Sequence, residues 1–178
     1  MTGKESIDLE LKNIYSSWFA YRRGKKPNTD LDNFQYNLEK ELSNLWHNLN
    51  NGCYKHGTYK KFIVSDNKTR EISVAPIRDR VVHRLLYDYL VRIYDKTFIY
   101  DTWSCRKNKG LFAGIERTQY FMGKFKNGFV WRADIRKFFD NVDHSILKKI
   151  INRLITDKIT AGLIDKIIDS YEPKPCKG

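Results

Sequence analysis

The chain has 178 residues, of which 41% are hydrophobic and 14% aromatic, so it can bury a core and is not of disordered composition. No apolar run reaches the roughly 20 residues of a membrane helix, and the N-terminus lacks a secretion signal, so we expect a cytoplasmic protein with no membrane partner. The net charge of +12 favours a polyanionic partner, nucleic acid above all, over a merely solvated surface. The charge is concentrated in residues 55–109, which hold 13 Lys and Arg against 6 Asp and Glu.

The first half of the chain is predicted to be mainly helical. Apolar residues recur at helical spacing on both sides of a basic linker over 21–30, and Asp30 is placed to cap the second helix. We interpret both stripes as core rather than as a functional site. They comprise Ile7, Leu11, Ile14, Tyr15, Trp18 and Phe19 before the linker, and Phe34, Leu38, Leu42, Leu45, Trp46 and Leu49 after it.

Residues 59–76 predict a β-hairpin, because the runs FIV and REISV flank the polar turn SDNKT. On the second strand Arg70 shares a face with Ile72 and Val74. A helix follows, with Asp79 near its start. His83 lies beside the apolar stripe of that helix and is interpreted as a core or boundary histidine, since no second metal ligand accompanies it.

The second half begins with a polar basic loop that leads into a helix starting near Gly110. Residues 128–135, GFVWRADI, alternate as a half-buried strand should, with Asp134 near its end on the face opposite Trp131. Asp140 is expected in a turn that hydrogen-bonds its own backbone, and Asp143 is placed to cap a helix over 146–154. A last helix covers 163–168. This order of elements predicts an α+β fold with a sheet covered on one side.

The three cysteines Cys53, Cys105 and Cys176 form no C-x-x-C pair, which argues against a zinc site or a disulfide framework. Asp134 attracts attention instead. A carboxylate at a strand end needs a cation when it is buried, and either an arginine or Mg²⁺ can supply it. Two Mg²⁺ ions can stabilise both oxygens of a phosphoryl transfer. A structural salt bridge or a turn cap is the alternative.

Three segments resemble, in the same order and with similar spacing, conserved blocks of bacterial reverse transcriptases of the group II intron, retron and diversity-generating-retroelement kind. KTREISVAPIRDRVVHRLL (68–86) and FIYDTWSCRKNKG (98–110) are similar to two fingers blocks, and WRADIRKFFDNVDHSIL (131–147) resembles the palm block with the first catalytic aspartate. The resemblance covers about residues 55–150. It implies an N-terminal helix over 1–22, a fingers region over 23–128 and a partial palm over 129–178.

The resemblance also implies roles for matched positions. Asp134 would be catalytic and would ligate two Mg²⁺ ions with help from the carbonyl of Ile135, and Arg70 would grip the dNTP triphosphate together with Lys68. Three more nucleotide-binding positions are implied: Phe139 beneath the incoming sugar, Phe138 as its rival, and Asp140. The template or another nucleic acid would be contacted by Arg78, Arg80, Arg106, Lys107 and Lys109.

One part of the family pattern is absent from the sequence. No Asp-Asp pair and no Gly-x-Pro-x-Gly-like block occur, so one carboxylate stands where the family uses three. We therefore expect an N-terminal fragment of an RNA-directed DNA polymerase, a nucleotidyltransferase that extends a DNA or RNA primer with dNTPs on an RNA template. The chain alone is expected to be inactive and, through exposed apolar surface, able to self-associate. A non-catalytic RNA- or DNA-binding module and a protein–protein scaffold are the alternatives.

Overall fold

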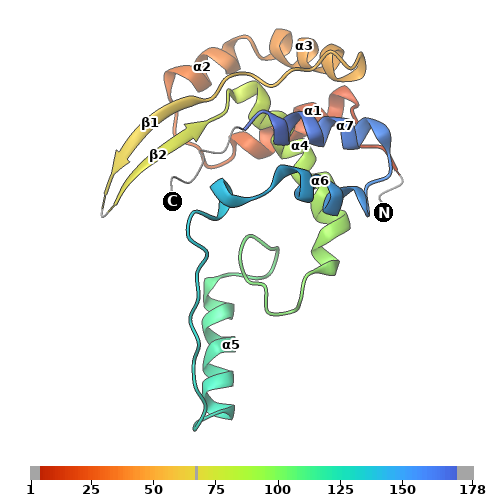
Figure 1. Cartoon of the computed structure of the whole chain (residues 1–178). Helices are drawn as coiled ribbons and strands as arrows, with labels where there is room; N and C mark the ends of the chain where they lie inside the picture. The colour runs from red at the N-terminus through yellow and green to blue at the C-terminus, as the bar shows by residue number, and fades with distance from the viewer. Residues whose placement is uncertain (1–4, 67, 172–178) are drawn as a thin grey trace.

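The computed structural model describes residues 5–66 and 68–171 and has the α+β architecture that the sequence predicts (Figure 1). A helical body carries two projections, a β-hairpin and an arm formed by residues 98–137. The elements are α1 (Leu11–Arg22), α2 (Thr29–Tyr36), α3 (Leu38–Asn50), β1 (Lys60–Ser65), β2 (Thr69–Val74), α4 (Ile77–Tyr94), η1 (Asp95–Thr97), α5 (Leu111–Lys124), η2 (Phe138–Asn141), α6 (His144–Asn152) and α7 (Lys158–Asp169).

The core forms around α4, which packs against α1, α2 and α3. The apolar stripes predicted from the sequence supply most of it, and Trp18 stacks obliquely on Phe34 at a centroid distance of 4.9 Å. Burying a side chain of this size contributes about 1.5–3 kcal/mol. The stripe on α7 closes the body from the other end of the chain. The fully buried side chains include Ile14, Leu31, Leu42, Leu45, Val81, Val82 and Ile155.

The region after the linker differs from the prediction of a single helix. It contains two helices, because Asn37 leaves helical geometry with φ −100° and ψ 22° between α2 and α3. The cap of α2 is Asn28, whose side chain accepts a hydrogen bond from the amide of Leu31 at 3.0 Å, and Asp30 lies in the first turn instead.

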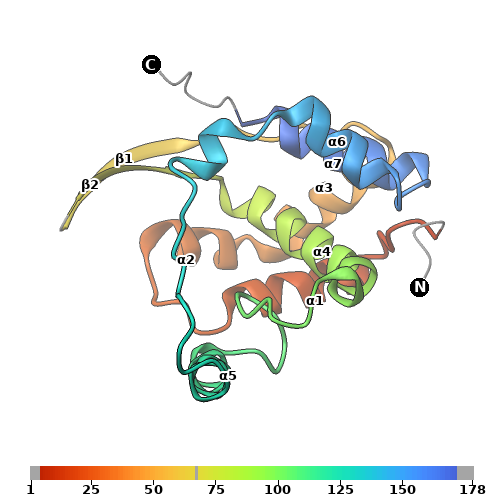
Figure 2. The same cartoon turned by 60° about the horizontal axis from the view of Figure 1, so that its bottom comes forward.

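The predicted hairpin and the helix after it are confirmed. β1 and β2 pair antiparallel, with Lys60 opposite Val74 and Ser65 opposite Thr69. Figure 2 shows that the hairpin leaves the body near the start of α4 and that its far end has no other element beside it. The turn residue Asn67 lies outside the described residues.

The strand predicted over 128–135 is wrong. These residues are extended but unpaired, and Phe129 and Trp131 are 105% and 89% exposed. Alternating apolar residues do not by themselves make a strand, because the backbone N–H and C=O groups also need a neighbouring strand to pair with. Among residues 5–66 and 68–171 the only strands are β1 and β2, which pair with each other.

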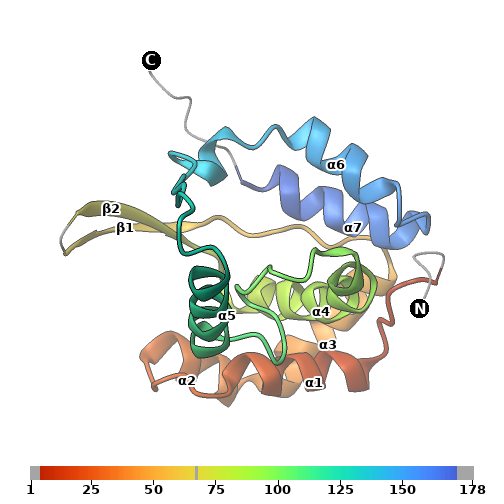
Figure 3. The same ribbon diagram turned by 90° about the horizontal axis from the view of Figure 1, so that it is seen from below.

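α5 and α6 begin near the predicted positions, α7 contains the predicted stripe but begins earlier, at Lys158, and Figure 3 shows α6 and α7 side by side. Asp143 caps α6 as predicted, since its Oδ1 accepts from the amides of Ser145 at 2.8 Å and Ile146 at 3.0 Å. The α6 stripe is not core, however, because Ile146 and Ile150 are exposed. In the described part of the chain no helix is long and apolar enough to cross a membrane.

Candidate nucleic-acid interface

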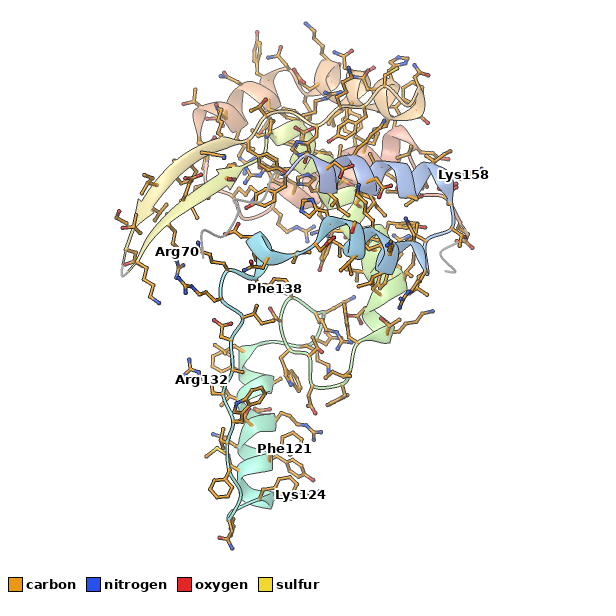
Figure 4. The ribbon with its side chains drawn as sticks, viewed as in Figure 1. Arg70, Phe121, Lys124, Arg132, Phe138 and Lys158 are labelled. Carbon is orange, nitrogen blue, oxygen red and sulfur yellow. The ribbon has the colours of Figure 1, made fainter. Side chains whose placement is uncertain are left out.

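The register of the hairpin sorts its side chains onto two faces. Residues directly opposite one another in an antiparallel pair share a face, so Arg70, which pairs with Val64, lies on the face that carries Phe62 and Val74. Arg70 is exposed near the hairpin end (Figure 4), and Lys68 is exposed beside it. These two predicted nucleotide-binding cations are therefore neighbours on one projecting element.

A cavity of about 970 Å³ opens beside the base of this same hairpin face. Its other walls are the linker between α1 and α2, the helices α2 and α3, and the first turn of α4. Basic residues outnumber acidic ones in the lining, with Lys25, Lys26, Lys60, Arg78 and Arg80 facing Asp30 and Glu41. We call this the cationic cavity.

Among residues 5–66 and 68–171, only Lys60 of these cations has an acidic partner in an ion pair. Lys60 is paired with Asp30 at 2.8 Å. Lys25 and Arg80 instead lie over the ring of Tyr21, at 4.6 and 5.2 Å from its centroid. Burial raises the pKa of Tyr21, although Arg80 opposes the shift, so the phenol is neutral and does not cancel their charge.

Arg78 is the least satisfied of the lining cations. Its guanidinium lies 5.8 Å from the ring centroid of Tyr54, and its buried Nη2 has no hydrogen-bond partner among the described residues. A buried donor without an acceptor is costly. The amino ends of α2 and α4 also line the cavity and add partial positive charge. The cations and helix ends of this lining suit an anion with several acceptor oxygens, such as a phosphate.

Arg106, predicted to contact the template, is engaged inside its own loop. Its side chain is 13% exposed and pairs with Asp95, with Nε 2.7 Å from Oδ1. The other nitrogens donate to the carbonyls of Asp95, Ile99 and Thr102. The hydrogen bond from Arg106 holds the pKa of Asp95 below its usual value. This geometry makes Arg106 an organiser of the loop, and a template contact by it stays a prediction.

Lys107 and Lys109, in the same loop, are placed differently from Arg106. Lys107 is exposed. Lys109 Nζ lies 3.5 Å from the ring centroid of Tyr100 and 4.4 Å from that of Trp103, and it also donates to the carbonyl of Tyr100. The loop therefore presents cation–aromatic pairs of the kind on which unpaired bases can stack.

Sequence reasoning did not single out Arg117, which continues this pattern on α5. Its guanidinium pairs with Asp101 at 2.9 Å and lies 4.4 Å from the ring centroid of Phe121. The rings of Tyr100 and Tyr120 also lie beside it, with centroids at 5.3 and 5.4 Å. Figure 4 shows Phe121, Lys124 and Arg132 along the arm. A helical recurrence of aromatic and basic residues over 111–125 was the available signal.

Asp134 lies in the extended part of the arm rather than at a strand end. It is exposed, and among the described residues it makes no hydrogen bond or ion pair. Ile135 beside it is 65% exposed. The chain then turns sharply at Lys137, whose φ of 50° is left-handed, and the amides of Asp140 and Asn141 both donate to the carbonyl of Lys137.

The residues after this turn are divided between solvent and the body. Phe138 and Phe139 are exposed and contact each other edge-to-face at 5.3 Å. Asp140 does not hydrogen-bond its own backbone as predicted, because its Oδ1 accepts from the hydroxyl of Tyr171 at 3.1 Å. The amide of Asn141 makes the local contacts instead, to the carbonyls of Arg136 and Lys137.

The described residues fit only part of a two-Mg²⁺ site. One carboxylate and one carbonyl, from Asp134 and Ile135, are hard oxygen donors of the right kind for Mg²⁺. Over residues 5–66 and 68–171, however, no three His, Cys, Asp or Glu side chains gather as a metal site.

The last finding about this region was not expected from the sequence. His83, interpreted as a core or boundary residue, faces His56 with 3.1 Å between the two Nε2 atoms. The buried carboxylate of Asp79 lies next to this pair and accepts from Tyr54. His56 and His83 are 27 positions apart, and Tyr54 and Asp79 are 25 apart, so no local sequence pattern predicts these contacts.

Comparison with known proteins shows sequence similarity to intron proteins. The chain is 26% identical over 166 residues to the COX1/OXI3 intron 1 protein of Saccharomyces cerevisiae, a match that covers 89% of this chain and 20% of the relative. It is 25% identical to the COX1/OXI3 intron 2 protein of the same yeast, over 71% of this chain and 15% of the relative. Protein YkfC of Escherichia coli is 25% identical over 75% of this chain and 36% of the relative. No family model matches the chain.

The chain is thus similar to intron proteins, and it spans about a third or less of the length of the curated relatives it matches.

Proposed function

We propose that this chain is the nucleic-acid-binding, N-terminal part of a reverse transcriptase related to those of group II introns. The observation that carries the proposal is the cationic cavity, with Arg78 and Arg80 in its lining, which opens beside the hairpin face that carries Arg70. The match to the COX1/OXI3 intron 1 protein, which covers 89% of this chain at 26% identity, supports the relation to group II introns.

In this proposal each region has its own task. The cationic cavity and the arm hold the phosphates and bases of an RNA template. Arg70 and Lys68 hold the triphosphate of a dNTP, for which a planar five-donor guanidinium is well shaped. Phe139 or Phe138 lies against the sugar. The primer 3′-hydroxyl attacks the α-phosphorus of the dNTP, the bond to the bridging oxygen breaks, and pyrophosphate leaves.

Magnesium would supply charge stabilisation for the attacking and leaving oxygens. Asp134 and Ile135 would hold it with one carboxylate and one carbonyl. We propose that the remaining ligands are outside the described residues, in a longer protein of the size of the matched relatives. The contribution of this chain is then to bind and orient nucleic acid and nucleotide.

The proposal is tested by the salt dependence of RNA binding. Fluorescence anisotropy of a labelled single-stranded RNA is measured between about 50 and 200 mM salt, where each phosphate contact contributes roughly −0.7 to the slope of log K against log salt. Arg78→Ala and Arg80→Ala should each weaken binding and reduce the slope by about that amount. Lys158→Ala, which removes an exposed cation far from Arg70 (Figure 4), is the matched control. A slope near zero, or equal losses in all three variants, would contradict the proposal.

A non-catalytic RNA- or DNA-binding module is the second candidate. It is favoured by the single candidate carboxylate, since the described residues contain no cluster of three metal-ligating side chains. The two candidates share the binding result and differ in the complete protein. There, Mg²⁺-dependent primer extension that disappears in Asp134→Ala supports the polymerase, and binding without extension supports the module.

A further inference from the structure

A buried network fixes the base of the hairpin to α4. Asp79, in the first turn of α4, is 2% exposed. Its Oδ1 accepts from the hydroxyl of Tyr54 at 2.8 Å and its Oδ2 from the amide of Gly57 at 2.9 Å. Burial first, and then the hydrogen bond to Asp79, raise the pKa of Tyr54 far above its usual value, so the hydroxyl keeps its proton and remains the donor.

The next member of the network is His56, whose side chain is 2% exposed. Its ring is stacked between Tyr59 and His83, with centroid distances of 4.9 and 5.1 Å. Its Nδ1 lies 2.6 Å from the carbonyl oxygen of Gly57. A carbonyl only accepts, so Nδ1 carries a proton.

This contact decides the tautomers of both histidines. In neutral His56 the proton sits on Nδ1, so Nε2 is an acceptor, and His83 must donate from its own Nε2 across the 3.1 Å contact. One added proton can be accommodated, because His83 can take it on Nδ1 and still donate from Nε2. A second added proton places N–H against N–H and removes the hydrogen bond.

The network continues beyond the hairpin to the turn after Asp134. The hydroxyl of Tyr59 lies 3.1 Å from Ser170 Oγ, and its ring meets that of Tyr171 edge-on at 6.0 Å. The hydroxyl of Tyr171 then donates to Asp140 Oδ1 at 3.1 Å. An unbroken series of contacts therefore joins α4 and the hairpin base to η2.

We propose that His56 is a positioning residue that couples the hairpin to η2 through Tyr59 and Tyr171, and that protonation of both His56 and His83 releases the coupling. The coupling follows from the contacts alone. Its importance for the alignment of Arg70 with the Asp134 region rests on the proposed function.

The environment of the histidine pair disfavours protonation of His83. The titratable or charged groups that face it are Asp79 and Arg80 on α4, Tyr54 and Tyr59 on the segment before β1, and Tyr171 after α7, which brings in Asp140 and Glu71. Burial, and then His56, lower the pKa of His83, and Asp79 opposes them. A lowered histidine pKa means that the contribution to stability is complete above the ordinary value of 6.5 and is lost as the pH falls through the folded-state value.

Amide hydrogen exchange of the 178-residue chain tests the coupling. The reporters are the amides of Asp140 and Asn141, which donate to the carbonyl of Lys137 within η2. His56→Gln and Tyr171→Phe should each accelerate their exchange roughly 3- to 10-fold, and the double variant should add little to either. His47→Gln, at an exposed histidine, is the matched control and should leave these amides unchanged. The proposal is overturned if His56→Gln affects only the hairpin, or if the two single effects multiply in the double variant.

A second measurement does not depend on any variant folding. Nitrogen-15 spectra of the imidazoles in the unmodified chain should show an Nδ1–H tautomer for His56 and an Nε2–H tautomer for His83 near pH 7.5. The Asp140 and Asn141 amides should lose protection as the pH is lowered toward about 5. The opposite tautomers, or protection independent of pH, would overturn the proposal. Neither measurement uses nucleic acid, so both remain decisive if the chain binds no RNA.

Discussion

Arg106 donates three hydrogen bonds to Asp95, from Nε to Oδ1 at 2.7 Å and from Nη2 to the backbone carbonyl at 2.8 Å and to Oδ2 at 3.3 Å. The contact joins the loop before α5 to the turn that ends α4. It allows two residues in that loop, Cys105 and Asn108, to hold left-handed φ values of 56° and 60°. The basic loop is thus a folded unit whose conformation depends on one guanidinium.

Replacement of Arg106 by lysine should open this loop. A single ammonium cannot reach the carboxylate and three carbonyls that the guanidinium spans. We expect limited trypsin cleavage at Lys107 and Lys109 to become several-fold faster, with little change in global unfolding, because the loop is outside the core. Arg117→Lys, at the other bidentate arginine of the arm, is the control. Unchanged cleavage in Arg106→Lys would contradict this account.

Gly57→Ala should destabilise the hairpin base. A Cβ at this position would lie 2.9 Å from Pro76 Cγ and 3.0 Å from Asp79 Oδ2. The carboxylate of Asp79 would therefore have to move away from the Gly57 amide, whose hydrogen bond it accepts. We expect a loss of about 1–3 kcal/mol in the free energy of unfolding measured by urea titration. Gly162→Ala, in α7 with no atom within 4 Å of the new Cβ, should instead gain about 0.5–1 kcal/mol. Equal effects of the two substitutions would show that the contact at Gly57 is not tight.

Asp157→Ala should loosen the contact between α7 and the segment before α1. Asp157 caps α7 through the amide and hydroxyl of Thr160, both at 2.7 Å, and also accepts from Ser6. Loss of such a cap costs about 1–2 kcal/mol. Burial raises the pKa of Asp157, but hydrogen bonds from Ser6 and Thr160 outweigh it and leave the pKa below 3.8.

The lowered pKa of Asp157 determines how the effect of Asp157→Ala depends on pH. The Asp157 contribution is complete above pH 3.8 and is lost as the pH falls through the folded-state value. The stability difference between the parent chain and Asp157→Ala should therefore be constant near neutrality and shrink in acid. Asp143→Ala, at the cap of α6, should show the same direction of pH dependence, because hydrogen bonds from Ser145 and Ile146 lower the pKa of Asp143 as well. A difference that grows on acidification would refute the assignment.

The 178-residue chain should not extend a primer. Its described residues offer Asp134 as one candidate Mg²⁺ carboxylate, and two ions in catalytic geometry need more ligands. The measurement is incubation of the purified chain with a primed RNA template, dNTPs and Mg²⁺, with a commercial reverse transcriptase as the positive control. Detectable extension above a preparation of Asp134→Ala would disprove the expectation.

Local patterns predicted the elements that need only themselves. The hairpin follows from two β-rich runs around a polar turn, and α4 follows from its apolar stripe. Asp143 was recognisable as a cap because a cap acts on the next three residues. The choice of Asn28 over Asp30 was not recognisable, since both precede the stripe and only the backbone at Asn28 is extended.

Contacts between distant residues explain what the sequence did not predict. The alternation of residues 128–135 is real, yet without a neighbouring strand among the described residues it produces an extended segment with exposed aromatic side chains. Likewise, the pairing of His56 with His83 and of Tyr171 with Asp140 depends on how the body folds. The basic charge pointed to nucleic acid, but the unpartnered nitrogen of Arg78 is visible only in three dimensions.

The core draws on both halves of the chain and omits the middle. The amide of Ile7 donates to the hydroxyl of Thr160 at 2.8 Å, whereas in the described part of the chain no buried apolar residue lies between Ile93 and Ile155. During synthesis on the ribosome, the first four helices must therefore wait for α7 before their core is closed. The aromatic arm emerges during that interval, so its exposed side chains are open to association before the core of the body is closed.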